Sequence, residues 1–156
     1  MGLWDFAVAI HAAPGVDEGL IALQDHHGQC VSYLLWAVWT ARCGRSANGA
    51  VLANGAALAR NWEAEVTAPL RAARRALKRG WDPVPDGARE ALRSEVKAGE
   101  FAAERLLMQA LEALTPERAA AGDVRERLAA AMGAWGGPAA IADAEPLLPM
   151  FETFAI

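Results

Sequence analysis

The run from Asp25 to Cys30, Asp-His-His-Gly-Gln-Cys, carries the residue types that hold zinc or iron in proteins. Neighbouring side chains on a helix point about 100° apart, so His26 and His27 do not readily chelate one ion together. Gly28 is a typical helix stop and separates both of them from Cys30. A site built from His11, Asp25 and one of His26 and His27 would need the first two helices to pack antiparallel. The spacing therefore favours no metal site, and no motif in the chain predicts a cofactor.

An acid–base pair is the second chemistry that these residue types allow. A carboxylate fixes the tautomer of an imidazole and raises its pKa, so His11 could act as a base if Asp25 met it, with Gln24 nearby. The tryptophans would then line a pocket for a flat or apolar ligand. The residues of this hypothetical pocket are Trp4, His11, Gln24, Asp25, His27, Trp36 and Trp39. The alternative is that the tryptophans fill the core and the polar groups hold the helices together.

A basic stripe is the third feature of the sequence. Arg71, Arg74, Arg75 and Lys78 recur at i, i+3, i+4 and i+7, which is the spacing of one helix face. Such a face suits phosphate, an acidic protein partner or RNA, and the acidic balance of the chain favours the protein partner over nucleic acid. The alternative is a solvated face that the carboxylates of the following helix neutralise in part, namely Glu90, Glu95, Glu100 and Glu104.

The usual catalytic motifs are missing from the sequence. It has no glycine-rich phosphate loop ending in Lys, no Gly-x-Ser-x-Gly nucleophile elbow and no His-Glu-x-x-His helix. We therefore assign no catalytic residue, and the sequence favours a protein that is not an enzyme.

Helical periodicity runs along the chain and predicts an all-α, single-domain bundle of five to seven helices. The stretch from Cys30 to Arg42 is apolar on almost every side, as is typical of a helix buried at the centre of a bundle. Two Asn-Gly pairs predict a loop from Gly44 to Gly55. The next helix, from Ala56 to Arg79, contains Pro69, which we expect to kink or split it near Ala68.

The chain divides into two parts by composition. We expect a helical domain over residues 1–137 and an apolar, proline-containing tail over residues 138–156. The tail carries Leu148, Phe151 and Phe154 and is too apolar to be left in water. It therefore packs either on the helical domain or on a partner.

Composition and charge narrow the class of function. The chain has 156 residues, and 54% of them are hydrophobic, which suffices for one core. The net charge of −4 argues against a protein dedicated to nucleic acid. The apolar stretch from Cys30 to Ala41 is shorter than the ~20 residues that span a bilayer, and no signal peptide is visible. We expect a cytoplasmic protein with reduced cysteines that binds neither DNA nor membrane.

Two blocks of residues carry a family resemblance. The first block comprises Trp4-Asp5-Phe6, Pro14-Gly15-Val16, Leu23-Gln24-Asp25 with His27-Gly28, Val31, Leu34-Leu35 and Trp39. The second block comprises Trp62, Glu65-Val66, Ala68-Pro69-Leu70-Arg71 and Arg74. Over about residues 3–110 the chain resembles a proteobacterial family of short, all-helical proteins of unknown function, departing from its pattern at Ser32, where Asn is expected. The resemblance implies an all-helical cytoplasmic protein and brings no activity, substrate or catalytic residue.

The leading hypothesis from the sequence is a non-enzymatic interaction or adaptor protein that forms a homo-oligomer and binds a protein partner, with an acidic partner at the basic stripe. The surplus of apolar residues, the basic stripe and the missing motifs favour it. The alternative is a small-ligand-binding protein or an unrecognised enzyme, with an aromatic-lined pocket around His11 and Asp25.

Overall fold

The computed structural model describes residues 1–155 and is all-helical; Ile156, the last residue of the predicted tail, lies outside the described residues. In chain order the elements are α1 (Leu3–His11), α2 (Val16–His27), α3 (Val31–Arg42), α4 (Gly49–Trp62), the π-helix η1 (Glu63–Thr67), α5 (Ala68–Ala76), α6 (Asp86–Ala113), α7 (Val124–Trp135), the 3₁₀-helix η2 (Ile141–Leu147) and α8 (Leu148–Thr153). The described part contains seven α-helices of nine residues or more, the six-residue α8 and no strand. The predicted all-α fold is confirmed.

The buried central helix is α3, as the sequence predicts. Its side chains from Tyr33 to Ala41 are almost completely shielded from solvent, Trp36 and Trp39 among them. The helix contacts α1, α2, α4, α6 and α7, which leaves no side of it facing water. Because every side of α3 is apolar, each neighbouring helix can bury its own apolar stripe against it.

Helix α4 begins earlier than the sequence suggests. The side chain of Asn48 accepts a hydrogen bond from the backbone N–H of Val51 at 3.0 Å and caps the helix. The predicted loop is therefore wrong from Gly49 onward. Gly55 lies inside α4, where a Cβ atom would come within 2.5 Å of the Trp36 ring. The glycine is thus explained by close packing of two helices rather than by a turn.

We expect Gly55→Ala to lower the free energy of unfolding by about 2 kcal/mol, because its methyl group meets the buried Trp36 ring. The better helix propensity of alanine offsets only part of that cost. Gly133→Ala is the matched control: Gly133 lies in α7 with open space at its Cβ position, and we expect a gain of about 0.5 kcal/mol there. Urea unfolding followed by circular dichroism measures both, and equal effects would contradict the packing explanation.

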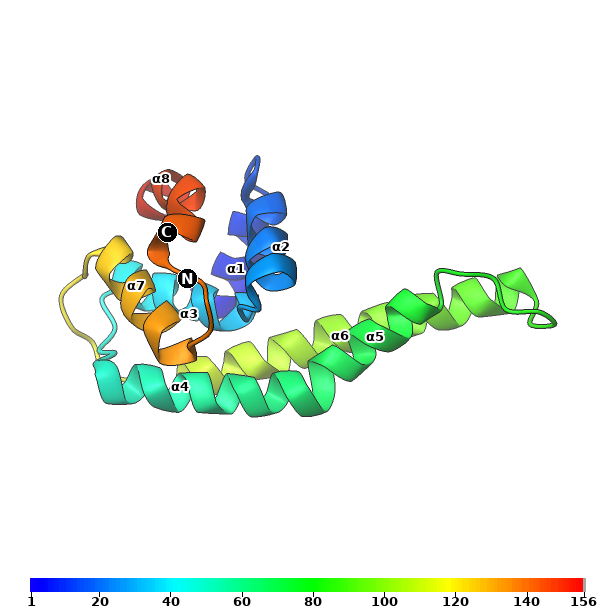
Figure 1. The fold of residues 1–156 in the computed structure, drawn as a ribbon. Helices are drawn as coiled ribbons and strands as arrows, with labels where there is room; N and C mark the ends of the chain where they lie inside the picture. Colours follow the sequence, from blue (N-terminus) through cyan, green and yellow to red (C-terminus); the bar gives the residue numbers. More distant parts are fainter. Residues whose placement is uncertain (156) are drawn as a thin grey trace.

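Pro69 does not split the long helix. The chain runs from α4 through η1 into α5, in which Pro69 occupies the first turn. Proline has no N–H for the backbone ladder, and the π-helical turn directly before it changes the ladder's register. The kink predicted near Ala68 is therefore a π-helical segment, and Figure 1 shows the chain bending between α4 and α5.

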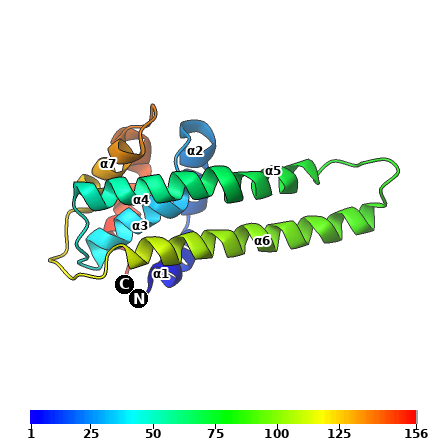
Figure 2. The same ribbon diagram turned by 90° about the horizontal axis from the view of Figure 1, so that it is seen from below.

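A two-helix arm projects from the helical body (Figure 1). We use this name for residues 68–99, which comprise α5 and the first half of α6. Seen from below, α4 with α5 and α6 run side by side along the length of the molecule (Figure 2). Trp81 and Val84 are exposed at the tip of the arm. The arm leaves the body beside α2 and so creates a concave corner.

The tail folds back on the body. Its η2 and α8 contact α2 and α7, with Leu147, Leu148 and Phe151 buried. Leu147 sits against Gly19 of α2, where a Cβ atom would lie 2.6 Å from it. The guanidinium of Arg42 donates a hydrogen bond to the carbonyl oxygen of Phe154 at 2.7 Å. Both side-chain and backbone contacts thus hold the described tail residues in place.

No single helix among residues 1–155 has the length and apolarity needed to cross a bilayer. Helices α1 and α2 reach that length and composition only as a pair, and a bend of 104° separates them.

Candidate functional site

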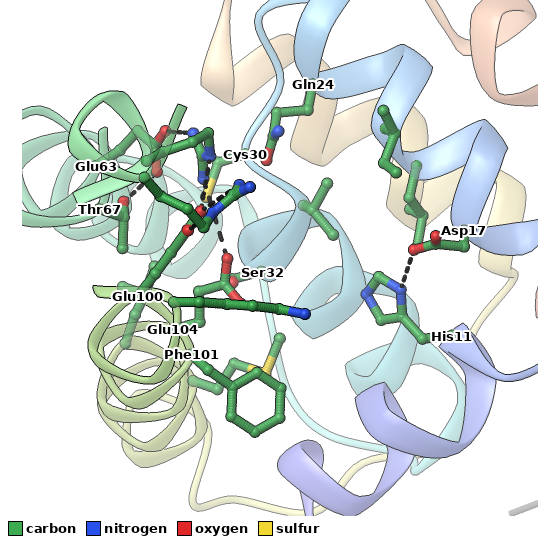
Figure 3. Close-up of a pocket in the computed structure, with 18 of the residues that line it drawn as sticks. His11, Asp17, Gln24, Cys30, Ser32, Glu63, Thr67, Glu100, Phe101 and Glu104 are labelled. Atoms are coloured by element: carbon green, nitrogen blue, oxygen red, sulfur yellow. Dashed lines mark hydrogen bonds and ion pairs between the residues drawn. The ribbon is translucent and has the colours of Figure 1, made fainter. Parts of the chain in front are cut away.

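A cleft of about 740 Å³ opens in the corner between the body and the arm. Helix α2 forms one wall, α6 forms the other, and η1 with α5 closes one side. Cys30, Val31 and Ser32, at the start of α3, contribute to its floor. Figure 3 shows Glu63, Thr67 and Glu100 on one side of the cleft, with His11 and Asp17 on the other. The volume lies within the range of about 300–1,000 Å³ that small-molecule sites occupy.

The α6 wall presents a mixed face to the cleft. Lys97, Glu100, Phe101 and Glu104 are spaced at i, i+3, i+4 and i+7, so they lie on one side of the helix. Lys97, Glu100 and Glu104 are charged, whereas Phe101 is an exposed aromatic ring. The wall therefore offers apolar and ionic contacts side by side.

Buried ion pairs join the arm to the side of the cleft. The Arg71 guanidinium lies 2.6 Å from a carboxylate oxygen of Glu63, 3.2 Å from one of Glu100 and 4.0 Å from one of Glu104. The Arg74 guanidinium also donates to Glu100, with its second contact at 3.3 Å. Three carboxylates and two guanidinium groups thus meet where α5 packs on α6. Only the Glu104 carboxylate makes no hydrogen bond among the described residues.

Burial raises the pKa of Glu104 to about 7, and the nearby carboxylate of Glu100 adds to the shift, while Arg71 opposes it. The side chain nevertheless stays 34% exposed toward the cleft. A carboxyl group in a cleft with a pKa near neutrality marks a candidate functional position. Glu104 can therefore exchange its proton, or its charge partner, at neutral pH.

Cys30 is a structural residue of the cleft floor. It is the N-cap residue of α3, a position that commonly activates a thiol. Its burial outweighs this effect and raises the pKa of the thiol to about 12. The thiol is therefore protonated at neutral pH and is no nucleophile.

The structure does not pair His11 with Asp25. The Nδ1 atom of His11 lies 3.2 Å from Asp17. Asp25 lies about 12 Å further along α2 than Asp17. Asp25 instead accepts hydrogen bonds from Gln24 at 3.1 Å and Arg75 at 2.9 Å, both of which lower its pKa. The hypothesis that Asp25 orients His11 is therefore wrong, and of the predicted polar residues only His11 and Gln24 line the cleft.

The tryptophans do not line the cleft. Trp36 and Trp39 are fully buried in the core. Trp4 packs edge-on against Phe101, with ring centroids 4.8 Å apart. The aromatic lining predicted from these tryptophans is wrong because they fill the spaces around α3, and Phe101 supplies the aromatic ring of the cleft.

His27 lies outside the cleft, with its Nδ1 atom 3.7 Å from Asp143 of η2. This contact ties the end of α2 to the tail. Within residues 1–155, no group of three histidine, cysteine or acidic side chains is placed to hold a metal ion.

Most of the basic stripe is ion-paired within the chain. Arg71 and Arg74 bind carboxylates of η1 and α6, and Arg75 binds Asp25 of α2. Lys78, the fourth member, is exposed and makes no ion pair among the described residues. The stripe therefore faces α6 and α2 more than it faces solvent, and of the four carboxylates named from the sequence only Glu100 and Glu104 lie beside it.

Sequence reasoning assigned no functional role to Ser32, Phe101 or Glu104, which line the cleft. Glu100 and Glu104 were recognised only as charges that could neutralise the stripe. The spacing of Lys97, Phe101 and Glu104 on one helix face was the available signal. That signal is weak, because such a face is as common on solvated helices as on binding surfaces.

Fold and cleft together define an all-α protein with an open, mixed-charge cleft at the base of a two-helix arm. The chain belongs to the family described as "Protein of unknown function (DUF2390)", whose pattern matches residues 2–111. The resemblance to a family of unknown function is confirmed at this level. All residues that line the cleft fall within the matched part, whereas α7 and the tail lie beyond it. No curated protein and no solved structure matches the chain.

Proposed function

We propose that the protein is a non-enzymatic interaction protein that holds a segment of a protein partner in the cleft between α2 and α6. One observation carries this proposal: apolar side chains are exposed on both walls of the open cleft, Ile21 at 47% on α2 and Phe101 at 56% on α6. Apolar side chains that face each other across a groove are typical of surfaces that take up a helix or an extended segment.

The cellular setting of the proposal follows the sequence. We propose a bacterial cytoplasmic protein, as the family resemblance implies, and a homo-oligomer remains a prediction. An acidic partner at the basic stripe has less support, because Arg71, Arg74 and Arg75 already have carboxylate partners. The cleft, with charges of both signs on its walls, is the better place for a partner.

A small-ligand-binding protein or an unrecognised enzyme is the second candidate. The cleft volume and the pKa of Glu104 near 7, a value suited to a general base, favour it. The protonated thiol of Cys30 provides no nucleophile. His11, paired with Asp17, could serve as an acid or base, but it lies across the cleft from Glu104 (Figure 3). The interaction role is therefore the function that the site supports better.

Native mass spectrometry of the untagged protein, purified from the cells that make it, tests the proposal. We expect the mass of the chain together with a protein partner. Phe101→Asp should remove that partner by placing a charge on the apolar rim. Leu92→Asp is the matched control, since Leu92 is 49% exposed on the same helix but lies outside the cleft.

Three results would count against the interaction role. A bare monomer, or the same loss of partner in both variants, would contradict it. Extra mass below about 1 kDa that disappears on denaturation would favour the small-ligand candidate, whose pockets hold molecules of that size.

A further inference from the structure

We infer that the cleft holds an ammonium group at Glu104, and that this group belongs to a lysine side chain of the protein partner. The inference rests on the proposed function, because the lysine would lie in the segment that docks between α2 and α6. It adds the chemistry that selects the segment.

Where η1, α5 and α6 meet beside the cleft, the carboxylates outnumber the guanidinium groups by one. Glu63, Glu100 and Glu104 provide three negative charges, and Arg71 and Arg74 provide two positive charges, which leaves one negative charge in excess. Both guanidinium groups direct their short contacts to Glu63 and Glu100. The excess charge therefore falls on Glu104, which faces the cleft.

The Glu104 carboxylate is open to a new partner. Its nearest cation is Arg71 at 4.0 Å, which is beyond hydrogen-bonding distance. Lys97 precedes it by about 10 Å along α6 and forms no ion pair with it among the described residues. A cation that entered the cleft could therefore donate directly to both carboxylate oxygens.

Ser32 is a second, independent sign of a ligand. It lines the cleft floor and is only 6% exposed, yet its hydroxyl has no hydrogen-bond partner among residues 1–155. The hydroxyl opens toward the cleft and is not sealed in the core, so water or a donor that enters the cleft can bind it. Figure 3 labels Ser32 together with Glu104 among the side chains that line the cleft. An ammonium group donates three hydrogen bonds and can serve a carboxylate and a hydroxyl at once.

The walls of the cleft suit the stem of a lysine. Ile21 on α2 and Phe101 on α6 provide exposed apolar surface on the two walls. A lysine places an ammonium at the end of four methylene groups, which pack well on such surface. An anion fits poorly, because it would meet the excess negative charge and find both guanidinium groups occupied.

The inference can be tested with a blocked lysine, Nα-acetyl-lysine N-methylamide, followed by shifts of the amide NMR signals at pH 8. We expect the largest shifts around Ser32, Phe101 and Glu104. Glu104→Gln should weaken binding about tenfold, the effect of losing a partly buried charge pair. Glu95→Gln is the matched control, because Glu95 is exposed on the same helix outside the cleft, and it should bind as the original protein does.

Two further readouts separate an ionic site from a merely structural residue. The blocked lysine carrying an additional Nε-acetyl group should not bind, since it has lost its charge. Binding should tighten from pH 6 to pH 8, because the proton competes with the ammonium for Glu104, and this dependence should vanish in Glu104→Gln.

Three outcomes would overturn the inference. The first is equal affinity of Glu104→Gln and the original protein for the blocked lysine. The second is at least tenfold tighter binding of 1,4-diaminobutane, which would assign the site to a free polyamine. The third is a partner complex that persists in Glu104→Gln but is lost in Phe101→Asp, in which case the proposed function stands without the lysine. If no partner complex exists while the blocked lysine binds, the interaction role fails instead, and the site takes free amines.

Discussion

Arg71→Met is expected to lower the free energy of unfolding by about 3 kcal/mol at pH 8. The guanidinium contacts Glu63 and Glu100 directly and lies nearest to Glu104, while its own side chain is only 12% exposed. Without it, the three carboxylates repel one another in a poorly hydrated place, with Arg74 alone to balance them. Such an uncompensated buried charge costs far more than a lost surface ion pair.

The loss in Arg71→Met should shrink as the pH is lowered to 5.5. The pKa of Glu104 is raised in the folded protein above the value of the unfolded chain, so the folded state binds the extra proton below pH 7. Stability from this group is therefore greatest at low pH and falls as the pH rises through about 7. Because Arg71 normally lowers this pKa, its removal strengthens the dependence on pH.

Arg75→Met is the matched control, because it makes the same change on the same helix. Arg75 pairs with Asp25 at 2.9 Å, but its side chain is 52% exposed, so we expect a loss of at most about 1 kcal/mol. Urea unfolding at pH 8 and pH 5.5 measures both variants. Equal losses in the two variants, or a loss in Arg71→Met that ignores pH, would show that the cluster is not electrostatically coupled.

Trp36→Ala should cost about 4 kcal/mol of the free energy of unfolding. The Trp36 ring is fully buried between α3 and α4, lies against Gly55, and has its centroid 5.6 Å from that of Tyr33. Its indole N–H also points to the hydroxyl of Thr115 at 3.4 Å. Truncation leaves a cavity that the tightly packed central helix cannot close.

Trp81→Ala is the control for the loss of a tryptophan as such. Trp81 is exposed at the tip of the arm, and we expect a change within about 0.5 kcal/mol. Thermal and urea unfolding compare the two variants. A Trp36→Ala protein as stable as the original, with ligand binding as its only defect, would restore the hypothesis that Trp36 lines a pocket.

The fold was largely predictable because its strongest determinant is local. The apolar run from Cys30 to Arg42 can only be buried, and the other helices must surround it. The errors arose where tertiary contacts decide. Gly55 resembles a turn residue in the sequence, yet it is selected by the Trp36 ring on another helix. Similarly, Pro69 predicts a break in the backbone hydrogen bonding, but it does not predict that the preceding turn is a π-helix.

The candidate site was less predictable because its parts come from distant segments. Ser32 and Glu104 are 72 positions apart in the chain and meet only at the cleft. Short-range patterns instead drew attention to Asp25 and His27, which hold α2 to the arm and to the tail. The ion pairs of the basic stripe were equally hard to predict. The stripe itself is visible in the sequence, but its carboxylate partners lie on three other elements, η1, α6 and α2. Of these partners, the sequence indicated only the carboxylate on α6.

The occupant of the cleft can be identified directly by photo-crosslinking in living cells. A benzophenone amino acid is placed at position 21, 101 or 92, one position per variant; the first two line the cleft and the third lies outside it on α6. We expect the same protein to be captured from positions 21 and 101 but not from 92, through a peptide that contains a lysine. Equal capture from all three positions, or none from the two cleft positions, would contradict a partner-binding cleft.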